Sequence, residues 1–435
     1  MESTGAWIAT RGDGVGGGIT VPGDKSISHR ALMLGGIAEG TTEVSGFLEG
    51  EDCLATMAAM RAMGVRILRG TGGRVTIDGV GLAGLSPPRA ALDMGNAGTA
   101  MRLMTGLLAG QSFDSVLVGD SSLMKRPMER VAAPLRQMGA VVETQEGRPP
   151  VRIHGGQRLV GFDHQLNVAS AQVKSALLLA GLYAGGRTSV TEPAVTRDHT
   201  ERMLRAFGIE VTVEGARVSL VPGLLQGTRI DVPADFSSAA FFIVAATIAG
   251  TSPLVIRNVG VNPTRTGLLE MLRLMGGRIE LRNPRLAGDE PVADLLVEPA
   301  RLRGITVPAG LVPLAIDEFP AFFVAAALAD GETTVSGAAE LRVKESDRIG
   351  VMAEGLAGLG ASVEALPDGM RIRGGRLGGG TIDSHGDHRI AMAFAVAAAC
   401  ADAPVRILDV ANVATSFPGF PSVAASAGLR VEVVA

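Results

Sequence analysis

Two patterns of hydrophobic and polar positions recur along this chain. The first is a stretch with the 3.6-residue spacing of an amphipathic helix, which ends at a glycine and is followed by residues that alternate as in a β-strand. A glycine at that point fits the left-handed conformation that closes many helices. Six stretches of this kind, 68 to 84 residues apart, end at Gly64, Gly139, Gly208, Gly276, Gly360 and Gly428. The spacing predicts six copies of one structural unit.

The second pattern is an alanine-rich helix that each unit enters through polar residues. Stretches such as 241–246 are apolar on every side, which predicts buried helices. With the strands that follow, each unit is expected to be β-α-β-α-β-β. The polar entrances are 25–26, 98–99, 170–172, 237–238, 317–318 and 387–389.

The last unit stops short of its closing strands, and we expect residues 7–21 at the start of the chain to supply them. The two ends of the chain would then share one domain, residues 1–21 plus 235–435, with a second domain, 22–234, inserted into it. Helix N-termini present free N–H groups and positive dipole ends. Buried helices that converge with their polar entrances together therefore predict a site for anions.

Composition narrows the classes of function. The chain has 435 residues, of which 46% are hydrophobic and 3% aromatic, and its net charge is −4. Too few aromatic side chains are present for stacking on single-stranded nucleic acid. An acidic chain also lacks the general basic face that binds DNA or an anionic membrane. We expect neither a nucleic-acid nor a membrane partner.

Cysteine and histidine do not suggest a metal or a disulfide framework. Cys53 and Cys400 are the two cysteines and lie far apart in the chain, which favours a reducing, cytoplasmic location. His385 and His388 lack further ligands at metal-binding spacing, so a capping or hydrogen-bonding role is the better interpretation. The sequence Gly12-x-Gly14-x-x-Gly17 precedes a strand-like segment instead of a helix and does not predict a dinucleotide site.

Cationic side chains gather in three short segments: 25–30, 343–348 and 125–126, the last just before Pro127, where a helix is expected to begin. Only four of the 40 basic residues are lysines, and Lys25 stands with Ser26 and Arg30 at the first entrance. In 343–348, the i, i+3 and i+4 spacing predicts that Lys344, Asp347 and Arg348 share one helix face. Solvated charged faces and surface ion pairs are the alternative explanations.

Five motifs resemble those of the 5-enolpyruvylshikimate-3-phosphate (EPSP) synthase family, in family order and over nearly the whole chain. They are Asp24-Lys25-Ser26-Ile27-Ser28-His29-Arg30, Gly95-Asn96-Ala97-Gly98-Thr99-Ala100-Met101-Arg102, Lys125-Arg126-Pro127-Met128, Val343-Lys344-Glu345-Ser346-Asp347-Arg348 and Gly386-Asp387-His388-Arg389-Ile390-Ala391-Met392.

The resemblance implies an α/β protein of two domains with three β-α-β-α-β-β units each, whose buried helices direct their N-termini to a cleft between the domains. It implies transfer of the enolpyruvyl group of phosphoenolpyruvate to the 5-hydroxyl of shikimate 3-phosphate, with release of phosphate, in the shikimate pathway. It implies no cofactor and no metal, inhibition by glyphosate at the phosphoenolpyruvate site, and a cytoplasmic enzyme that we expect to be a monomer.

The resemblance also implies roles for individual residues. For shikimate 3-phosphate they are Lys25, Ser26, Arg30, Ser170, Ala171, Gln172, Arg197, Asp317 and Lys344. For phosphoenolpyruvate they are Lys25, Gly98, Arg126, Gln172, Arg348 and Arg389. Asp317 resembles the family's base on the 5-hydroxyl. Glu345 and Lys25 are the candidates for proton transfer at the methylene carbon, and the division between these two stays open.

Some positions depart from the common family pattern and resemble the family's second bacterial subgroup. Ala171 replaces a serine of many members, and 414–418 contains no lysine, whereas many members have one before Thr-Phe-Pro. Two alternatives remain. The related UDP-N-acetylglucosamine enolpyruvyl transferases usually carry a cysteine in a loop that corresponds to 120–124, which has none. A non-catalytic repeat scaffold would not need Asp317 and Glu345 among so many cations.

Overall fold

A computed structural model describes residues 5–434 of the chain. Residues 1–4 and 435, which belong to the predicted domain 1–21 plus 235–435, lie outside the described residues. The chain divides into two units. Unit 1 comprises the residues up to Pro22, Pro233–Leu286 and the residues from Pro291 onward. Unit 2 comprises Gly23–Val232 together with Ala287–Glu290.

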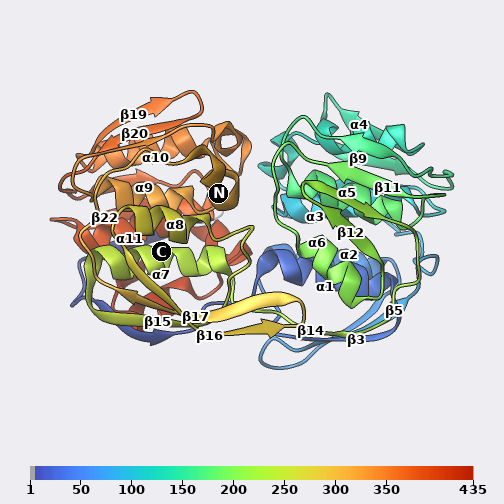
Figure 1. Ribbon diagram of the computed structural model, residues 1–435, viewed down its shortest axis with the longest axis horizontal. Helices are drawn as coiled ribbons and strands as arrows, with labels where there is room; N and C mark the ends of the chain where they lie inside the picture. The colour runs from blue at the N-terminus through green and yellow to red at the C-terminus, as the bar shows by residue number, and fades with distance from the viewer. Residues whose placement is uncertain (1–4, 435) are drawn as a thin grey trace. The chain divides into compact units, whose positions relative to one another are not determined.

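Unit 2 consists of three mixed sheets and the helices that they enclose (Figure 1). The sheets have the strand orders β14 (Arg229–Asp231), β3 (Glu39–Ser45), β5 (Val75–Val80), β4 (Arg66–Arg69); β6 (Leu92–Asp93), β7 (Ser115–Val118), β9 (Arg148–His154), β8 (Val141–Gln145); and β10 (Asp163–Gln165), β11 (Thr188–Thr191), β13 (Arg217–Leu220), β12 (Val211–Glu214). The helices are α1 (Lys25–Ile37), α2 (Glu51–Ala62), α3 (Gly98–Ala109), α4 (Glu129–Gln137), α5 (Ala171–Gly181) and α6 (His199–Ala206).

Unit 1 is built in the same way. Its sheets have the orders β16 (Arg278–Ala287), β17 (Glu290–Glu298), β15 (Gly250–Gly260), β2 (Val15–Ile19); β18 (Glu332–Val335), β20 (Gly369–Arg373), β19 (Ser362–Leu366); and β21 (Gly380–Asp383), β22 (Val405–Leu408), β1 (Ala6–Thr10), β23 (Arg430–Val434). Its helices are α7 (Phe236–Ala249), α8 (Gly267–Leu274), α9 (Phe319–Ala327), α10 (Arg348–Gly358), α11 (His388–Ala397) and α12 (Phe420–Ser426).

The glycines that the sequence places after helices confirm the repeat. Gly64, Gly139, Gly208, Gly276, Gly360 and Gly428 all have positive φ angles, between 89° and 98°. Only glycine adopts this conformation at little cost, because it has no Cβ to clash with the backbone. Each glycine therefore ends its helix and turns the chain into the next strand.

The last strand before each crossing between the units pairs with a strand of its own unit that is distant in the sequence. β2 precedes α1 of unit 2 in sequence but pairs in parallel with β15 of unit 1, with Ile19 opposite Ile256. β14 precedes α7 of unit 1 but pairs in parallel with β3 of unit 2, with Ile230 opposite Val44. Each unit thus completes a sheet with a strand that is distant in sequence.

The pairing of β2 corrects the prediction for residues 7–21. β1 does close the last sheet, since it pairs antiparallel with β22 and with β23. β2 does not, because its partner is β15 in another sheet. The sheet around α9 also departs from the predicted unit: it has three strands, and isolated parallel bridges of Arg303 and Thr306 stand where its first strand was expected.

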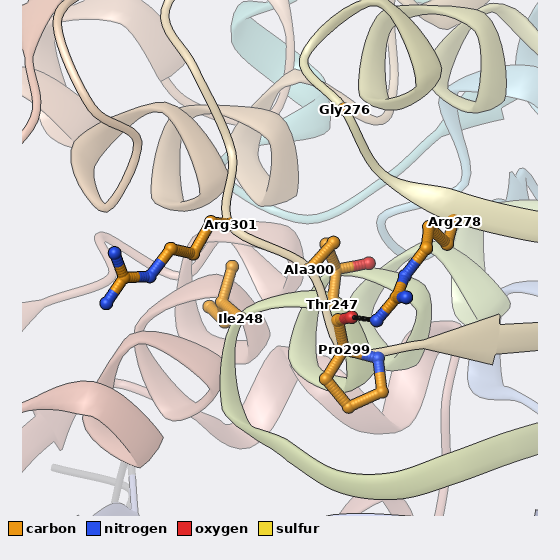
Figure 2. A pocket seen from close by; sticks show the side chains of 7 residues that line it. All are labelled: Thr247, Ile248, Gly276, Arg278, Pro299, Ala300 and Arg301. Atoms are coloured by element: carbon orange, nitrogen blue, oxygen red, sulfur yellow. Dashed lines mark hydrogen bonds between the residues drawn. The ribbon is translucent and has the colours of Figure 1, made fainter.

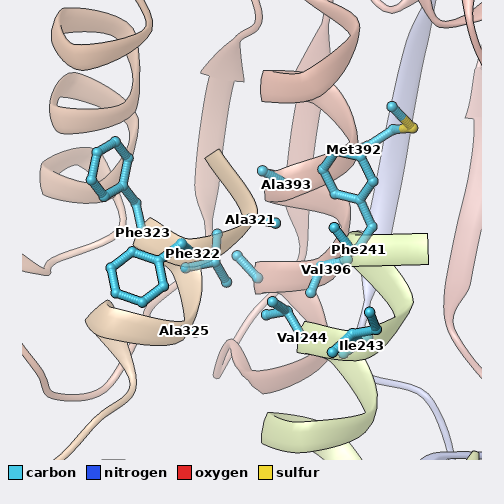
Figure 3. Packing of buried hydrophobic residues seen from close by; sticks show 14 of the residues in the cluster. Phe241, Ile243, Val244, Ala321, Phe322, Phe323, Ala325, Met392, Ala393 and Val396 are labelled. Atoms are coloured by element: carbon cyan, nitrogen blue, oxygen red, sulfur yellow. The ribbon is translucent and has the colours of Figure 1, made fainter. Parts of the chain in front are cut away.

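Buried helices form the core of each unit, as their apolar sequences predict. In unit 1, α7, α9 and α11 pack against one another, and Phe241, Val244, Phe322 and Val396 meet at their contacts (Figure 3). In unit 2, α3 packs against α5, and every α1 residue from Ile27 to Ile37 is buried. Across residues 5–434, no helix has both the length and the apolar character needed to cross a membrane.

Candidate active site

The polar entrances of the unit 2 helices gather in one place. α1 begins at Lys25 after Asp24, whose side chain accepts from Ile27 N at 2.8 Å. α5 begins after Ser170, whose side chain accepts from Val173 N at 3.4 Å. These caps are expected of Asp and Ser, whose side-chain oxygens satisfy free N–H groups of the first turn. Hydrogen bonds between α1, α3 and α5 then hold the three N-termini together.

Gln172 joins the entrances of α5 and α3. Its Nε2 donates to Thr99 Oγ1 at 2.8 Å, and its Oε1 accepts from Arg102 Nη1 at 2.5 Å. Both ends of the amide are therefore fixed by α3. The sequence motif contained Arg102, but the sequence analysis gave it no role; an arginine on a helix that is otherwise buried and apolar was the available signal.

Two guanidinium groups lie against the backbone of Gly98, the first residue of α3. A Cβ added to Gly98 would stand 2.9 Å from Arg126 Nη1 and 3.1 Å from Arg102 Nη1. Arg126 Nη2 donates to Asn96 Oδ1 at 2.6 Å, which fixes the guanidinium beside the helix entrance. Arginine side chains beside a helix N-terminus form a site suited to phosphate or carboxylate.

Arg30 is buried within the same cluster. Nε donates to Thr200 Oγ1 at 2.7 Å, Nη2 to Ser175 Oγ at 2.8 Å and Nη1 to the carbonyl of Ser26 at 2.9 Å. Burial is the main cause that lowers the pKa of Arg30 to about 10; the charge of Arg197 also lowers it, while Glu201 and Asp24 oppose the shift. Arg30 thus keeps its positive charge at neutral pH, and the partly exposed Arg197 adds its field to the same region.

Lys25 forms an ion pair that the sequence analysis missed. Its Nζ lies 2.5 Å from Oδ2 of Asp52, a buried residue in the first turn of α2. An acid in a first turn is common because it complements the helix dipole, so the sequence offered no separate signal for this contact.

Unit 1 contains a second cluster, centred on Asp317, which lies two residues before the start of α9. Asp317 Oδ1 lies 3.5 Å from Lys344 Nζ and 3.5 Å from Arg348 Nη1. Its backbone carbonyl accepts from Arg389 Nη1 at 3.1 Å. The structure thus brings Asp317, Lys344, Arg348 and Arg389 together from segments more than 70 residues apart.

Arg348 is the most buried member of this cluster, with 1% of its side chain exposed. Nη2 donates to Glu345 Oε2 at 2.6 Å and Nε donates to Asp387 Oδ2 at 2.8 Å. Burial lowers the pKa of Arg348, but Asp387, Glu345 and Asp317 more than offset it, and the pKa lies above its ordinary value. Asp387 also caps α11 by accepting from Arg389 N at 2.9 Å. The sequence analysis missed the bond between Asp387 and Arg348, because an aspartate at a helix start is already explained by its capping role.

The prediction that Lys344, Asp347 and Arg348 share one helix face is wrong. α10 begins only at Arg348, because Asp347 is its N-cap and accepts from Gly350 N at 3.0 Å. Lys344 lies before the helix in extended conformation. Asp347 instead pairs with Arg342 at 2.5 Å, whereas Lys344 and Arg348 meet at Asp317.

A pocket of about 450 Å³ in unit 1 lies elsewhere (Figure 2). Thr247 and Ile248, near the C-terminal end of α7, line it together with Pro299 and two arginines, and Arg278 donates to the carbonyl of Pro299. None of the predicted site residues lines this pocket. Within residues 5–434, no group of three or more His, Cys, Asp or Glu side chains could hold a metal ion.

Comparison with known proteins assigns the chain. The sequence model of the family described as EPSP synthase (3-phosphoshikimate 1-carboxyvinyltransferase) matches residues 9–423. A 3-phosphoshikimate 1-carboxyvinyltransferase of Methylococcus capsulatus is 62% identical over 419 residues, which are 96% of each chain. The structure of an EPSP synthase from Acinetobacter baumannii is 55% identical, with a TM-score of 0.88 over 99% of this chain and 100% of that one.

A more distant structure shares the fold. The enolpyruvyl transferase NikO from Streptomyces tendae has a TM-score of 0.80 at 16% identity and covers 99% of both chains. The family match and the high-identity relatives therefore decide the assignment, and they do not favour a UDP-N-acetylglucosamine transferase. This chain belongs to the EPSP synthase family, the 3-phosphoshikimate 1-carboxyvinyltransferases.

Proposed function

We propose that the chain transfers the enolpyruvyl group of phosphoenolpyruvate to shikimate 3-phosphate with the residues of the two clusters. The unit 2 cluster chiefly binds the anions, and the unit 1 cluster contains Asp317, the proposed base on the 5-hydroxyl. The observation that carries this proposal is the carboxylate of Asp317, 3.5 Å from both Lys344 and Arg348. Lys344 and Arg348 hold this carboxylate in place, and a positioned carboxylate can act as a general base.

In this proposal, shikimate 3-phosphate binds at the entrances of α1 and α5. The N–H groups of the first turn of α5 and the charge of Arg197 suit its phosphate. Ala171 offers no hydroxyl there, so its contribution is the backbone N–H. The residues assigned to this substrate are Lys25, Ser26, Arg30, Ser170, Ala171, Gln172, Arg197, Asp317 and Lys344.

Phosphoenolpyruvate, with one phosphate and one carboxylate, suits a set of arginines. Guanidinium groups pair with such groups through two parallel hydrogen bonds. The positions of Arg126 against Gly98, and of Arg348 and Arg389 against Asp317, support this assignment. The residues assigned to it are Lys25, Gly98, Arg126, Gln172, Arg348 and Arg389.

The chemistry then follows in two steps. Asp317 takes the proton of the 5-hydroxyl as its oxygen bonds to the central carbon of phosphoenolpyruvate, while the methylene carbon receives a proton. This gives a tetrahedral intermediate. Loss of one methyl proton then re-forms the double bond and expels phosphate. Glu345 and Lys25 are the two candidates to give and take that proton. Arg126, Arg348 and Arg389 offset the negative charge of the intermediate and the departing phosphate.

We further propose that the enzyme acts in the cytoplasm as a monomer and needs no cofactor. No disulfide joins Cys53 and Cys400 within residues 5–434, which suits a reducing compartment. The proposed reaction transfers protons and the enolpyruvyl group and releases phosphate, without any oxidation or reduction. Sedimentation equilibrium of the purified protein would measure its molecular mass, and a mass of two or more chains would contradict the monomer.

Phosphate release tests the substrate assignment. With phosphoenolpyruvate present, we expect the purified enzyme to release phosphate when shikimate 3-phosphate is added and none when UDP-N-acetylglucosamine is added. Asp317→Asn is the matched negative control, since it keeps the shape of the side chain. Release with UDP-N-acetylglucosamine, or with neither acceptor, would contradict the proposal.

A further inference from the structure

α5 carries a buried lysine immediately after its entrance. Lys174 has 2% of its side chain exposed, although the rest of the helix core is built from residues such as Leu177 and Leu178. Its Nζ lies 2.8 Å from Glu192 Oε2 and 2.8 Å from Glu201 Oε1. Both of these carboxylates are also buried, so the three charges form one enclosed group.

The two carboxylates come from the segment that carries Arg197. Glu192 follows β11 and also accepts from Thr196 Oγ1 at 2.6 Å, next to Arg197. Glu201 lies in the first turn of α6, on the other side of Arg197. Lys174 therefore links the first turn of α5 to both ends of the segment 192–201.

A parallel set of hydrogen bonds joins the same elements to α1. Thr200 Oγ1 donates to Ser175 Oγ at 2.7 Å, and Arg30 donates to both hydroxyls. Residues 174 and 175 of α5 thus bind residues 200 and 201 of α6 side by side. With Arg30, the enclosed group has two cations for its two carboxylates.

We propose that Lys174 is a positioning residue, which fixes the first turn of α5 against the segment that carries Arg197 and so sets the affinity for shikimate 3-phosphate. This inference rests on the proposed function, in which Ser170, Ala171 and Arg197 hold that substrate. Lys174 does not touch the substrate in this account. It acts through the spacing between the helix entrance and the Arg197 side chain.

A contribution to folding stability does not by itself explain why Lys174, Glu192 and Glu201 are buried together. Replacing a buried ion pair by apolar residues of similar volume is often neutral or stabilising, because the charges lose their hydration when they are buried. A helix that already buries several leucines could be held by one more apolar residue. What an apolar residue cannot do is bind two carboxylates from different elements at a fixed distance.

The charge state of Lys174 suits this role. Burial lowers its pKa, but Glu201 and Glu192 more than offset that effect, and the pKa lies above its ordinary value. Lys174 therefore remains an ammonium at neutral pH and is not a proton acceptor in the reaction.

Lys174→Met is the primary test, since methionine keeps the length of the chain and removes its charge. We expect the KM for shikimate 3-phosphate, and its Kd by calorimetry, to rise about tenfold, in keeping with the cost of displacing a binding group by a fraction of an ångström. We expect kcat to fall less than threefold. The KM for phosphoenolpyruvate should change less than twofold, because α3 holds Gln172 independently.

Two further variants separate positioning from general destabilisation. Leu178→Val also disturbs the buried part of α5 but touches none of the charges, so it should lower the melting temperature without changing the Kd for shikimate 3-phosphate. Lys174→Arg keeps the charge and the donors, so it should restore the Kd to within threefold. If Lys174→Met does not fold, Glu192→Gln replaces it in the test, with an expected rise in KM of at least threefold.

The inference is overturned if folded Lys174→Met binds shikimate 3-phosphate within twofold of the parent, or if Leu178→Val weakens binding equally. If Glu192→Gln is the variant tested, an unchanged KM for shikimate 3-phosphate also overturns the inference. Failure of the proposed function would look different: the parent enzyme itself would not bind shikimate 3-phosphate, or Arg30→Lys would leave its binding intact.

Discussion

The polar clusters of unit 1 and unit 2 place their arginines in different surroundings. In unit 2, Arg30 donates to the oxygens of Ser26, Ser175 and Thr200, and Arg126 donates to Asn96 Oδ1, all of which are uncharged. In unit 1, Arg348 binds three carboxylates, those of Asp317, Glu345 and Asp387. The same side chain therefore meets neutral acceptors in one unit and charged ones in the other.

This difference indicates a difference in role. Glu201 and Asp24 act on the charge of Arg30 from nearby, but the hydrogen bonds of its guanidinium go to neutral oxygens, and such a group suits an anionic substrate better than one already paired with carboxylates. A cation among carboxylates has its charge largely offset, but its hydrogen bonds and ion pairs orient those carboxylates, as proton transfer requires. We therefore expect substitutions in unit 2 to change mainly binding, and substitutions in unit 1 to change mainly turnover.

Asp317→Asn should have the largest effect. It keeps the shape of the side chain and removes the proton acceptor, so kcat should fall by about 10²-fold or more. Stopped-flow or steady-state phosphate release would measure this. Glu340→Gln is the matched control, since Glu340 Oε1 lies 3.8 Å from the same Lys344 but has no proposed part in catalysis. Near-normal turnover of Asp317→Asn would remove Asp317 as the base.

Arg126→Lys should have the next largest effect, and on binding. Lysine keeps the charge but cannot form the paired hydrogen bonds of a guanidinium, so the KM for phosphoenolpyruvate should rise between about 10- and 100-fold. The change in kcat should be smaller than the change in KM. Steady-state kinetics at saturating shikimate 3-phosphate would decide this, and a fall in kcat with an unchanged KM would contradict the binding role of unit 2.

Gly98→Ala tests how closely ligands approach the entrance of α3. The added methyl would stand 2.9 Å from Arg126 Nη1, so the guanidinium must shift. Glyphosate is longer than phosphoenolpyruvate, so the altered site should weaken its binding more than that of the substrate. We expect its inhibition constant to rise more than tenfold, or about 1.4 kcal/mol, with a smaller rise in the KM for phosphoenolpyruvate. Equal shifts of both constants would show that Gly98 does not discriminate between the two ligands.

Asp24→Ala should have the smallest effect and act on stability. It removes the side-chain bond to Ile27 N at the start of α1. The loss of such a cap costs about 1 kcal/mol of unfolding free energy. Urea denaturation would measure it, with Asp24→Asn as a control that keeps the capping oxygen. Equal losses in both variants would show that the charge of Asp24, and not its cap, stabilises the helix.

Local signals in the sequence predicted much of the fold. The six helix-ending glycines and the polar entrances of the buried helices were visible because a left-handed residue and a helix N-cap each need particular side chains. The pairing of β2 with β15 and of β14 with β3 was not visible, since the pairing partner of a strand is not encoded near that strand. The helix face of 343–348 failed because Asp347 caps α10 instead of continuing it.

The candidate site was predicted less completely than the fold. Charged residues at the helix entrances could be found from the motifs, and the structure shows that Asp317, Lys344 and Arg348 meet. The ion pairs of Asp52 with Lys25 and of Asp387 with Arg348 could not, because each aspartate is an ordinary acid at a helix start until its distant cation is known. Their partners are set by packing between elements, which the spacing of residues along the chain does not reveal.

Calorimetry with shikimate 3-phosphate gives the most direct test of the division between binding in unit 2 and chemistry in unit 1. The account predicts that Asp317→Asn binds this substrate within about threefold of the parent, while Arg30→Lys weakens binding by at least about tenfold. If instead Asp317→Asn loses the affinity and Arg30→Lys keeps it, the division between the two clusters is wrong.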